Sequence, residues 1–240
     1  MATLEICTGS LASISAAVAA GAHRVEICAA LEVGGLTPSL GYLEAVFAQP
    51  LLNNNGEPVR RHVLIRPRGG DFCYDEEEIT VILRDIRLCK ALGADGVVVG
   101  ALTPQNDIDL TACTRFAEAA DNMSLTFHRA FDRCAQPFEA LEQIIRMGYH
   151  RLLTSGQAPK AELALPFLRS LVRQADGRIV IMPGSGVTPA NAARILRETG
   201  ASEIHASAKG LLSHDDTLFP GYFDTSTDIV AQILAEITKK

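Results

Sequence analysis

The chain has 240 residues, of which 48% are hydrophobic and 21% are charged, a composition typical of a folded globular protein rather than a disordered one. Its formal net charge of −6 gives no general attraction to nucleic acid or acidic lipid, both of which require clustered Lys and Arg. No apolar run reaches the roughly 18 residues needed to span a membrane, and no basic segment precedes "LASISAAVAA". We therefore expect neither a membrane anchor nor a signal peptide, and we expect a cytoplasmic location.

Short runs rich in β-branched residues alternate along the chain with segments of helical periodicity. Two such helical segments, 76–93 and 137–148, repeat apolar residues every three or four positions and end at glycine. Eight strands joined by helical crossovers predict a single parallel (β/α)8 TIM barrel, with a doubly wound open sheet as the alternative. The predicted strands are 4–8, 24–28, 62–67, 96–101, 124–129, 151–155, 179–185 and 203–207.

A repeated joint supports this strand count. Gly21, Gly93, Gly148 and Gly200 each stand a few residues before the second, fourth, sixth and eighth predicted strands. A glycine in this place fits the left-handed residue that often follows a helix. The repeat predicts that the chain is built from two-unit βαβα pieces.

No linker or low-complexity tract divides the sequence. We therefore predict one domain over residues 1–240, in which 210–240 form an irregular tail and a final helix. The six cysteines are scattered and none forms a Cys-x-x-Cys pair, so each is expected to be a free thiol.

Strand alternation sorts the side chains into two faces. Leu4 and Ile6 are the bulky apolar pair of the first strand, so they should pack under the helices while Glu5 and Cys7 point into the barrel. Buried charges cost several kcal/mol unless they are paired, so the inward groups should contact one another, either as a structural ion-pair network or as an active site at the C-terminal mouth. The predicted interior includes Glu5, Cys7, Glu26, Cys28, Arg66, His128, Glu203 and His205.

Two motifs follow predicted strands and supply candidate chemistry. In "RPRGGDFCYD" the guanidinium of Arg66 suits a carboxylate or phosphate ligand, or it is the structural partner of Glu26. In "TFHRAFDRC" a carboxylate at Asp132 could hold His128 in one tautomer as a general base, or His128 could bind a metal or be a hydrogen-bonded core residue.

A third motif, "MPGSGVTPAN", predicts an anion site. Gly184 and Gly186 would let the backbone approach a ligand, and Thr188 as N-cap would start a helix whose free N–H groups could hold phosphate. Ser207, after the last strand, would lie beside this loop. A plain glycine turn explains the motif equally well.

The strings "RVEICAALEVGGLTPSLG", "IRPRGGDFCY", "TFHRAFD", "RLLTSGQ" and "EIHASA" together resemble the CutC family of copper homeostasis proteins, from Leu4 to about Lys209. The resemblance implies a cytoplasmic (β/α)8 barrel that is often oligomeric, with a dimer favoured, and that has a proposed role in copper handling. It also implies Cu(I) as a ligand, attributed to two cysteines that correspond to Cys7 and Cys28. Soft thiolates on neighbouring strands suit Cu(I).

The sequence leaves three functions open. The first is Cu(I) binding or trafficking through the two cysteines. The second is a TIM-barrel enzyme acting on a small anionic metabolite, phosphorylated ones included. A structural or partner-binding barrel is the third. In the enzyme hypothesis Glu26 or His128 is the base and Arg66 holds the anion, and the candidate catalytic set is Glu26, Arg66, His128, Asp132 and His205.

Overall fold

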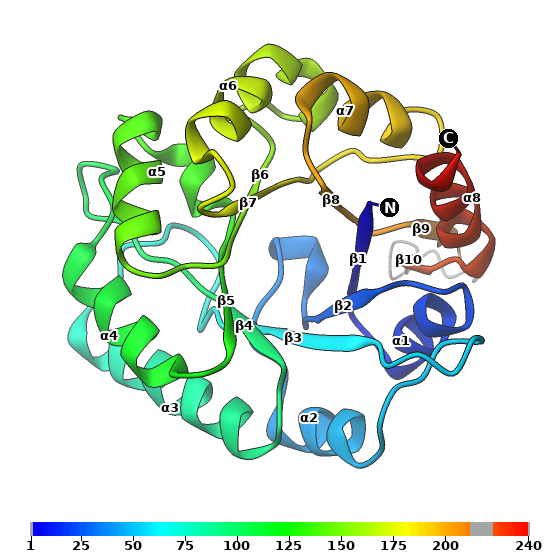
Figure 1. Ribbon diagram of the computed structural model, residues 1–240. Coiled ribbons are helices and arrows are strands. Elements are labelled where there is room, and N and C mark those ends of the chain that lie inside the picture. The colour runs from blue at the N-terminus through cyan, green and yellow to red at the C-terminus, as the bar shows by residue number, and fades with distance from the viewer. Residues whose placement is uncertain (1, 212–222, 240) are drawn as a thin grey trace, which may run out of the picture.

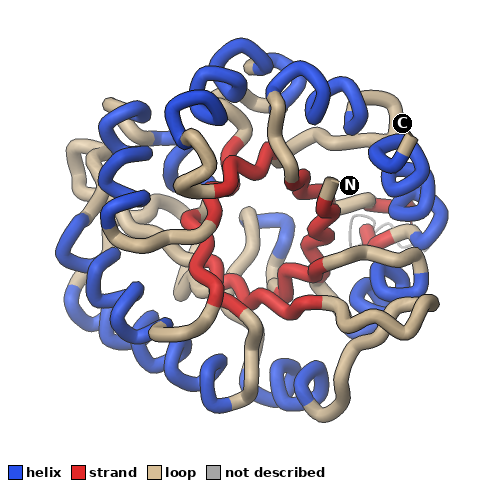
Figure 2. The backbone as a smooth tube through the Cα atoms, in the orientation of Figure 1, coloured by secondary structure: helices blue, strands red, loops and turns tan. Residues whose placement is uncertain are grey.

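The protein is an eight-stranded parallel β-barrel surrounded by helices, seen end-on in the computed structural model (Figure 1), which describes residues 2–211 and 223–239. The sheet order is β7-β6-β5-β4-β3-β2-β1-β8, and β7 and β8 at its two ends lie side by side, so the ring is nearly closed (Figure 2). This confirms the (β/α)8 prediction. The strands are β1 (Thr3–Thr8), β2 (Arg24–Ile27), β3 (Arg60–Leu64), β4 (Gly96–Val98), β5 (Ser124–Phe127), β6 (Arg151–Thr154), β7 (Val180–Pro183) and β8 (Glu203–Ala206).

Helices cover the outside of the ring (Figure 1). The longest begins with a capping box, in which Asp75 accepts from the backbone of Glu78 and Glu78 reaches back to Asp75. Gly21, Gly93, Gly148 and Gly200 all have φ between +78° and +95°, which explains why glycine recurs at these joints. The helices are α1 (Leu11–Ala19), α2 (Leu40–Phe47), α3 (Glu76–Ala91), α4 (Leu110–Ala120), α5 (Pro137–Arg146), α6 (Leu165–Ala175), α7 (Ala192–Thr199) and α8 (Thr227–Thr238), with short 3-10 turns η1 (Leu31–Val33), η2 (Arg129–Arg133) and η3 (Ala161–Leu163).

The strand faces follow the predicted alternation. Leu4 and Ile6 are fully buried in the large apolar layer between the strands and helices. Cys7 and Cys28 belong instead to a separate small cluster inside the barrel, with Leu64. The strand register determines which residues are neighbours on adjacent strands. It places Cys7 of β1 beside Glu26 of β2, and Glu5 of β1 beside His205 of β8.

The tail is described at its two ends. Strand β9 (Lys209–Leu211) pairs antiparallel with β10 (Phe223–Thr225), and α8 then packs against α1 and α7. The Ser10 hydroxyl donates to Asp224, which ties β10 to the start of α1. The middle of the segment predicted to be irregular, 212–222, lies outside the described residues. Within the described part of the chain, every helix is too short or too polar to cross a membrane.

Candidate functional site

A cavity of about 360 Å³ opens at the carboxyl ends of the strands, where enzymes of this fold place their sites. Most of the predicted site residues meet there. Asp132, Gly184 and Thr188 do not line it. The predicted residues that do line it are Cys7, Glu26, Cys28, Arg66, His128, Gly186, His205 and Ser207.

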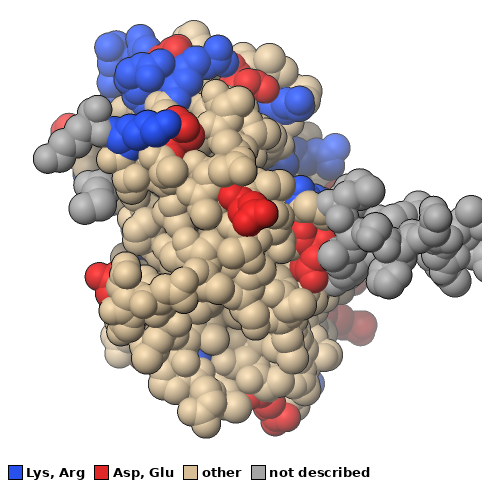
Figure 3. Space-filling model, turned by 90° about the vertical axis from the view of Figure 1, so that its right-hand side faces the viewer, with Lys and Arg blue, Asp and Glu red and all other residues tan. Residues whose placement is uncertain are grey.

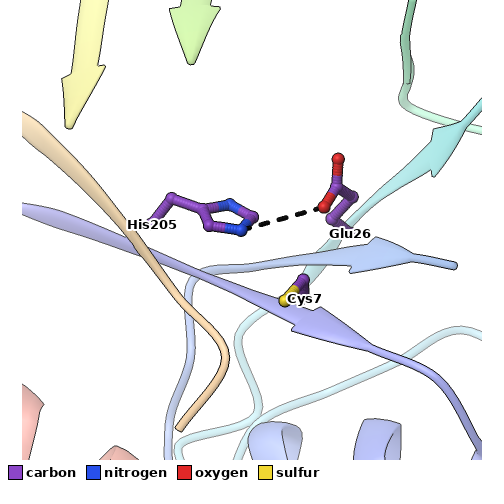
Figure 4. Close-up of side chains that lie close together, drawn as sticks. All are labelled: Cys7, Glu26 and His205. Atoms are coloured by element: carbon purple, nitrogen blue, oxygen red, sulfur yellow. Dashed lines mark ion pairs between the residues drawn. The ribbon is translucent and has the colours of Figure 1, made fainter. Parts of the chain in front are cut away.

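Three side chains in this cavity form what we call the donor cluster: Cys7, Glu26 and His205 (Figure 4). One sulfur, one carboxylate oxygen and one ring nitrogen from these residues all lie within 4.8 Å of one another. His205 Nε2 lies 3.8 Å from Glu26 Oε2, and the two side chains face each other across the cavity. The cluster therefore offers three kinds of donor atom to a single ligand.

A contact on the side away from the cavity holds the imidazole of His205 in place. Its Nδ1 lies 2.7 Å from Glu5 Oε1, deeper in the barrel. Burial by itself would lower the pKa of His205, but hydrogen bonds with Cys7 and Glu5 and the charge of Glu26 raise it well above its usual range. The imidazole is therefore held in place with Nε2 turned toward the other two donors.

The pKa values of the two carboxyl groups near His205 shift in opposite directions. Burial raises the pKa of Glu26 to about 7, against the opposing charge of His205. Burial also acts to raise the pKa of Glu5, but Arg24 and His205 outweigh it and hold that pKa far below its usual range. Glu5 is therefore a permanent anion, whereas Glu26 can carry or release a proton near neutral pH.

An ion-pair network lies beneath the donor cluster. The Arg24 guanidinium donates to Glu5 and to Glu203, and Arg151 Nε donates to Glu203 at 2.8 Å. Arg24 was not among the residues predicted to lie inside the barrel, although it is the first residue of the predicted strand 24–28. The alternation along this strand puts Arg24 on the inward face with Glu26. The structural ion-pair network considered from the sequence thus exists below the cavity.

The second predicted copper ligand, Cys28, lines the same cavity but is not part of the donor cluster. It is almost fully buried, and its thiol donates to the backbone oxygen of Glu26 at 3.8 Å. Burial and the charge of Glu26 raise the pKa of Cys28 well above its usual range, so this thiol is protonated in the metal-free protein.

Arg66 is buried at another wall of the cavity, and it does not pair with Glu26. Its Nη1 donates to Val33 O at 3.0 Å and Gly35 O at 3.2 Å, and its Nη2 donates to Gly70 O at 2.8 Å. The guanidinium also lies over the Phe72 ring, 4.7 Å from its centroid. Backbone carbonyls of the loops after β2 and β3 therefore hold this cation. Among the described residues, no carboxylate forms an ion pair with it.

The predicted pairing of His128 with Asp132 is wrong. His128 Nδ1 accepts from the Ala130 N–H at 3.3 Å, because His128 is the N-cap of η2. Asp132 turns away and accepts from Ser155 N at 3.0 Å and Ser155 Oγ at 2.9 Å, and it pairs with Arg129 at 2.8 Å. Asp132 therefore organises the loop after β6 and positions Arg129 at the cavity. Burial and the charge of Arg66 lower the pKa of His128 to about 3, so its ring is neutral.

The anion loop also differs from expectation. Helix α7 begins at Ala192 with Asn191 as its N-cap, three residues later than predicted. The Asn191 side chain accepts from Thr188 N at 2.8 Å and donates to Gly186 O at 2.9 Å, which folds this segment into a turn. The Thr188 N–H is therefore not free for an anion. A Cβ at Gly184 would lie 2.6 Å from Leu153 Cδ1 and 3.3 Å from His205 Cβ, so this glycine serves close packing.

Comparison with known sequences places these residues in a defined family. A profile of the CutC family matches residues 2–210, the part of the chain that carries the barrel. A relative named family protein CutC from Bacteroides thetaiotaomicron is 48% identical over 211 residues, which cover 88% of this chain and 82% of the relative. Another from Porphyromonas gingivalis is 47% identical over 212 residues, with 88% and 81% covered.

Comparison with solved structures leads to the same family. A crystal structure from Streptococcus agalactiae, described provisionally as the copper homeostasis protein CutC, is 34% identical and has a TM-score of 0.79, covering 86% of this chain and 99% of that one. Thiamine phosphate pyrophosphorylase from Pyrococcus furiosus has a TM-score of 0.60 at 15% identity, with 98% and 95% covered, and this likeness shows the fold alone.

Proposed function

The chain belongs to the CutC family, a copper homeostasis family, and from this membership and the donor cluster we propose that it binds Cu(I) at the mouth of the barrel. Sulfur and imidazole nitrogen are donors that Cu(I) accepts readily, whereas a carboxylate is a harder ligand. We therefore assign Cys7 Sγ and His205 Nε2 as two of the copper ligands. The thiol of Cys28 is assigned as the third. Glu26 would act as the neighbouring proton acceptor.

The position of His205 carries this proposal. A metal-binding histidine usually donates its second ring nitrogen to a carboxylate, which fixes the ring and raises its basicity. Glu5 fulfils this role at 2.7 Å from Nδ1, while Nε2 lies 3.8 Å from Glu26 Oε2 and a ring nitrogen lies within 4.8 Å of the sulfur of Cys7. Because Cu(I) displaces protons from thiol and imidazole, binding should strengthen as the pH rises.

A competition titration tests the proposal. The reduced, anaerobic protein is titrated with Cu(I) in the presence of a competing chelator, for the native chain, Cys7→Ser, Cys28→Ser and the double variant. Cys73→Ser is the matched control, because Cys73 is a more accessible thiol that does not line the cavity. We expect the affinity to fall at least tenfold in Cys7→Ser and further in the double variant, and to stay native in Cys73→Ser. Equal affinity in the native chain and the double variant would rule the site out.

A second candidate function is acid–base catalysis on a small metabolite. The observation that favours it is a carboxyl group, Glu26, with its pKa raised to about 7 and placed 3.8 Å from His205 in the cavity at the mouth of the barrel. Such a pair could remove and return a proton next to a carbonyl group. Incubation of the native chain with small carbonyl-containing acids in heavy water should then produce carbon-bound deuterium, detected by NMR. Exchange that persists in Glu26→Gln would contradict this function.

We also propose that the protein is cytoplasmic and forms a homo-oligomer, with a dimer favoured. The surface in Figure 3, on the side that carries α1 and α8, is largely uncharged, with Lys and Arg gathered at one end. Helix α1, "LASISAAVA", contains no charged residue, and Leu11 at its start is half exposed. Light scattering during gel filtration would measure the mass, and a monomer at every concentration would contradict the dimer.

A further inference from the structure

We propose that Arg66 and His128 form a binding site for a small oxyanion, a carboxylate or phosphate group, in the cavity beside the donor cluster. The two residues come from the ends of β3 and β5 and share Phe72 as a neighbour. Neither of them belongs to the donor cluster or to the ion-pair network beneath it. The site is therefore separate from the copper ligands, although both face one cavity.

The first support is the unbalanced charge of Arg66. The residue is 5% exposed and always charged, yet its partners are the neutral carbonyls of Val33, Gly35 and Gly70. These three bonds leave Nε buried without a hydrogen-bond partner among the described residues. The Tyr74 phenol also interacts with the Arg66 side chain, but it supplies no negative charge, because burial raises its pKa to about 12. A buried guanidinium in this state is costly unless an anion completes its surroundings.

The second support is the orientation of His128. Its Nδ1 accepts from the Ala130 N–H, so the proton of the neutral ring is on Nε2. That Nε2 is buried and has no hydrogen-bond partner among the described residues, although the ring lines the cavity. His128 therefore presents a donor, not an acceptor. Together with the Arg66 guanidinium it makes a pair of buried donors, a combination that selects an oxyanion.

The charges around the cavity also favour an anionic ligand. Its charged lining residues are Arg66, Arg129 and Lys209 against one carboxylate, Glu26, besides the imidazole of His205. Arg129 is neutralised by Asp132, but no ion pair is formed by Arg66 or Lys209 within the described residues. Lys209 precedes the part of the tail outside the described residues. The remaining positive charge attracts a small anion into a volume that fits a metabolite rather than a polymer.

Direct binding measurements test the site. Inorganic phosphate and acetate are titrated separately into the native chain, at low ionic strength with chloride as a reference anion, and followed by calorimetry and by NMR of the His128 ring. Phosphate and acetate distinguish a tetrahedral from a planar ligand. We expect saturable binding of at least one of them, and a selective shift of the His128 ring signals.

Two variants and a control make the test specific. Arg66→Met removes the cation. His128→Asn keeps an N-cap oxygen for Ala130 but removes the ring Nε2–H, whose position the shorter amide group does not reach. Each should weaken binding at least tenfold, whereas Arg115→Gln, which changes a partly exposed arginine on α4 that pairs with Glu76, should bind as the native chain does. His128→Asn keeps the test valid if Arg66→Met does not fold. Absence of saturable binding to the native chain, or equal binding by the native chain and His128→Asn, would overturn the proposal.

Discussion

His205 and Glu5 form a buried pair inside the barrel, with 2.7 Å between Nδ1 and Oε1. Glu5 is completely buried and also receives the Arg24 guanidinium, so one carboxylate joins the donor cluster to the ion-pair network beneath it. Breaking such a buried pair leaves uncompensated charge.

Glu5→Gln should therefore lower the free energy of unfolding by about 3–5 kcal/mol. It should also lower the pKa of His205, because the anion behind Nδ1 is lost. Urea unfolding measures the first effect and NMR titration of the His205 ring the second. Glu76→Gln is the control, since its pair with Arg115 is exposed and should be worth about 0–1 kcal/mol. Equal losses in the two variants would show that the Glu5 charge has no structural role.

The raised pKa of Glu26 predicts a pH-dependent cost. Its folded-state pKa of about 7 lies above the ordinary value of 4.5, so folding favours the protonated form. Both states are protonated at low pH, and the folded state becomes penalised as pH rises from about 4.5 to 7, by about 3 kcal/mol in all. Glu26→Gln should lack this loss, so its stability relative to the native chain should increase across that range. A constant difference between the two unfolding curves would contradict the shift.

The strands and their faces could be predicted because they depend on local alternation. Leu4 and Ile6 against Glu5 and Cys7 already divide the outside of the barrel from its interior, and the register then brings Cys7 opposite Glu26. Arg24, the first residue of its strand, follows the same alternation, although it was not predicted to lie inside the barrel. The thiol, imidazole and carboxylate groups of the cavity were therefore accessible from sequence as a set.

The pairing of side chains within that set could not be predicted. His128 and Asp132 are four residues apart, but η2 makes His128 a cap and turns Asp132 toward Ser155 on the next strand's loop. Asn191 likewise competes with Thr188 for the start of α7, and its two backbone bonds decide the outcome. Such choices depend on loop conformations that span several strands, which a sequence pattern does not contain.

The substitution Gly35→Ala tests how tightly the loop that holds Arg66 is packed. The φ of Gly35 is +89°, and an added Cβ would lie 2.5 Å from Leu64 Cδ2. Gly56 has φ +77° with nothing within 4 Å, so Gly56→Ala measures the backbone strain alone, about 1–2 kcal/mol. Gly35→Ala should cost more, by about 1–3 kcal/mol for the forced shift of Leu64. The comparison is made by urea unfolding, and equal costs would show that Leu64 moves freely.

Asp132→Asn separates the loop function of this carboxylate from the dyad suggested by the sequence. The substitution weakens its bonds to Ser155 and to Arg129, so the chain should lose about 1–3 kcal/mol of stability. The ring of His128 should keep its Nε2–H tautomer, because its Nδ1 is bound to Ala130 and not to Asp132. Nitrogen NMR of the histidine rings measures the tautomer directly. Asp71→Asn is the control, since Asp71 is an exposed carboxylate that pairs with Arg68 and accepts from the Cys73 N–H at 3.2 Å. A change of the His128 tautomer in Asp132→Asn, absent from Asp71→Asn, would restore the dyad and with it a base at this wall of the cavity.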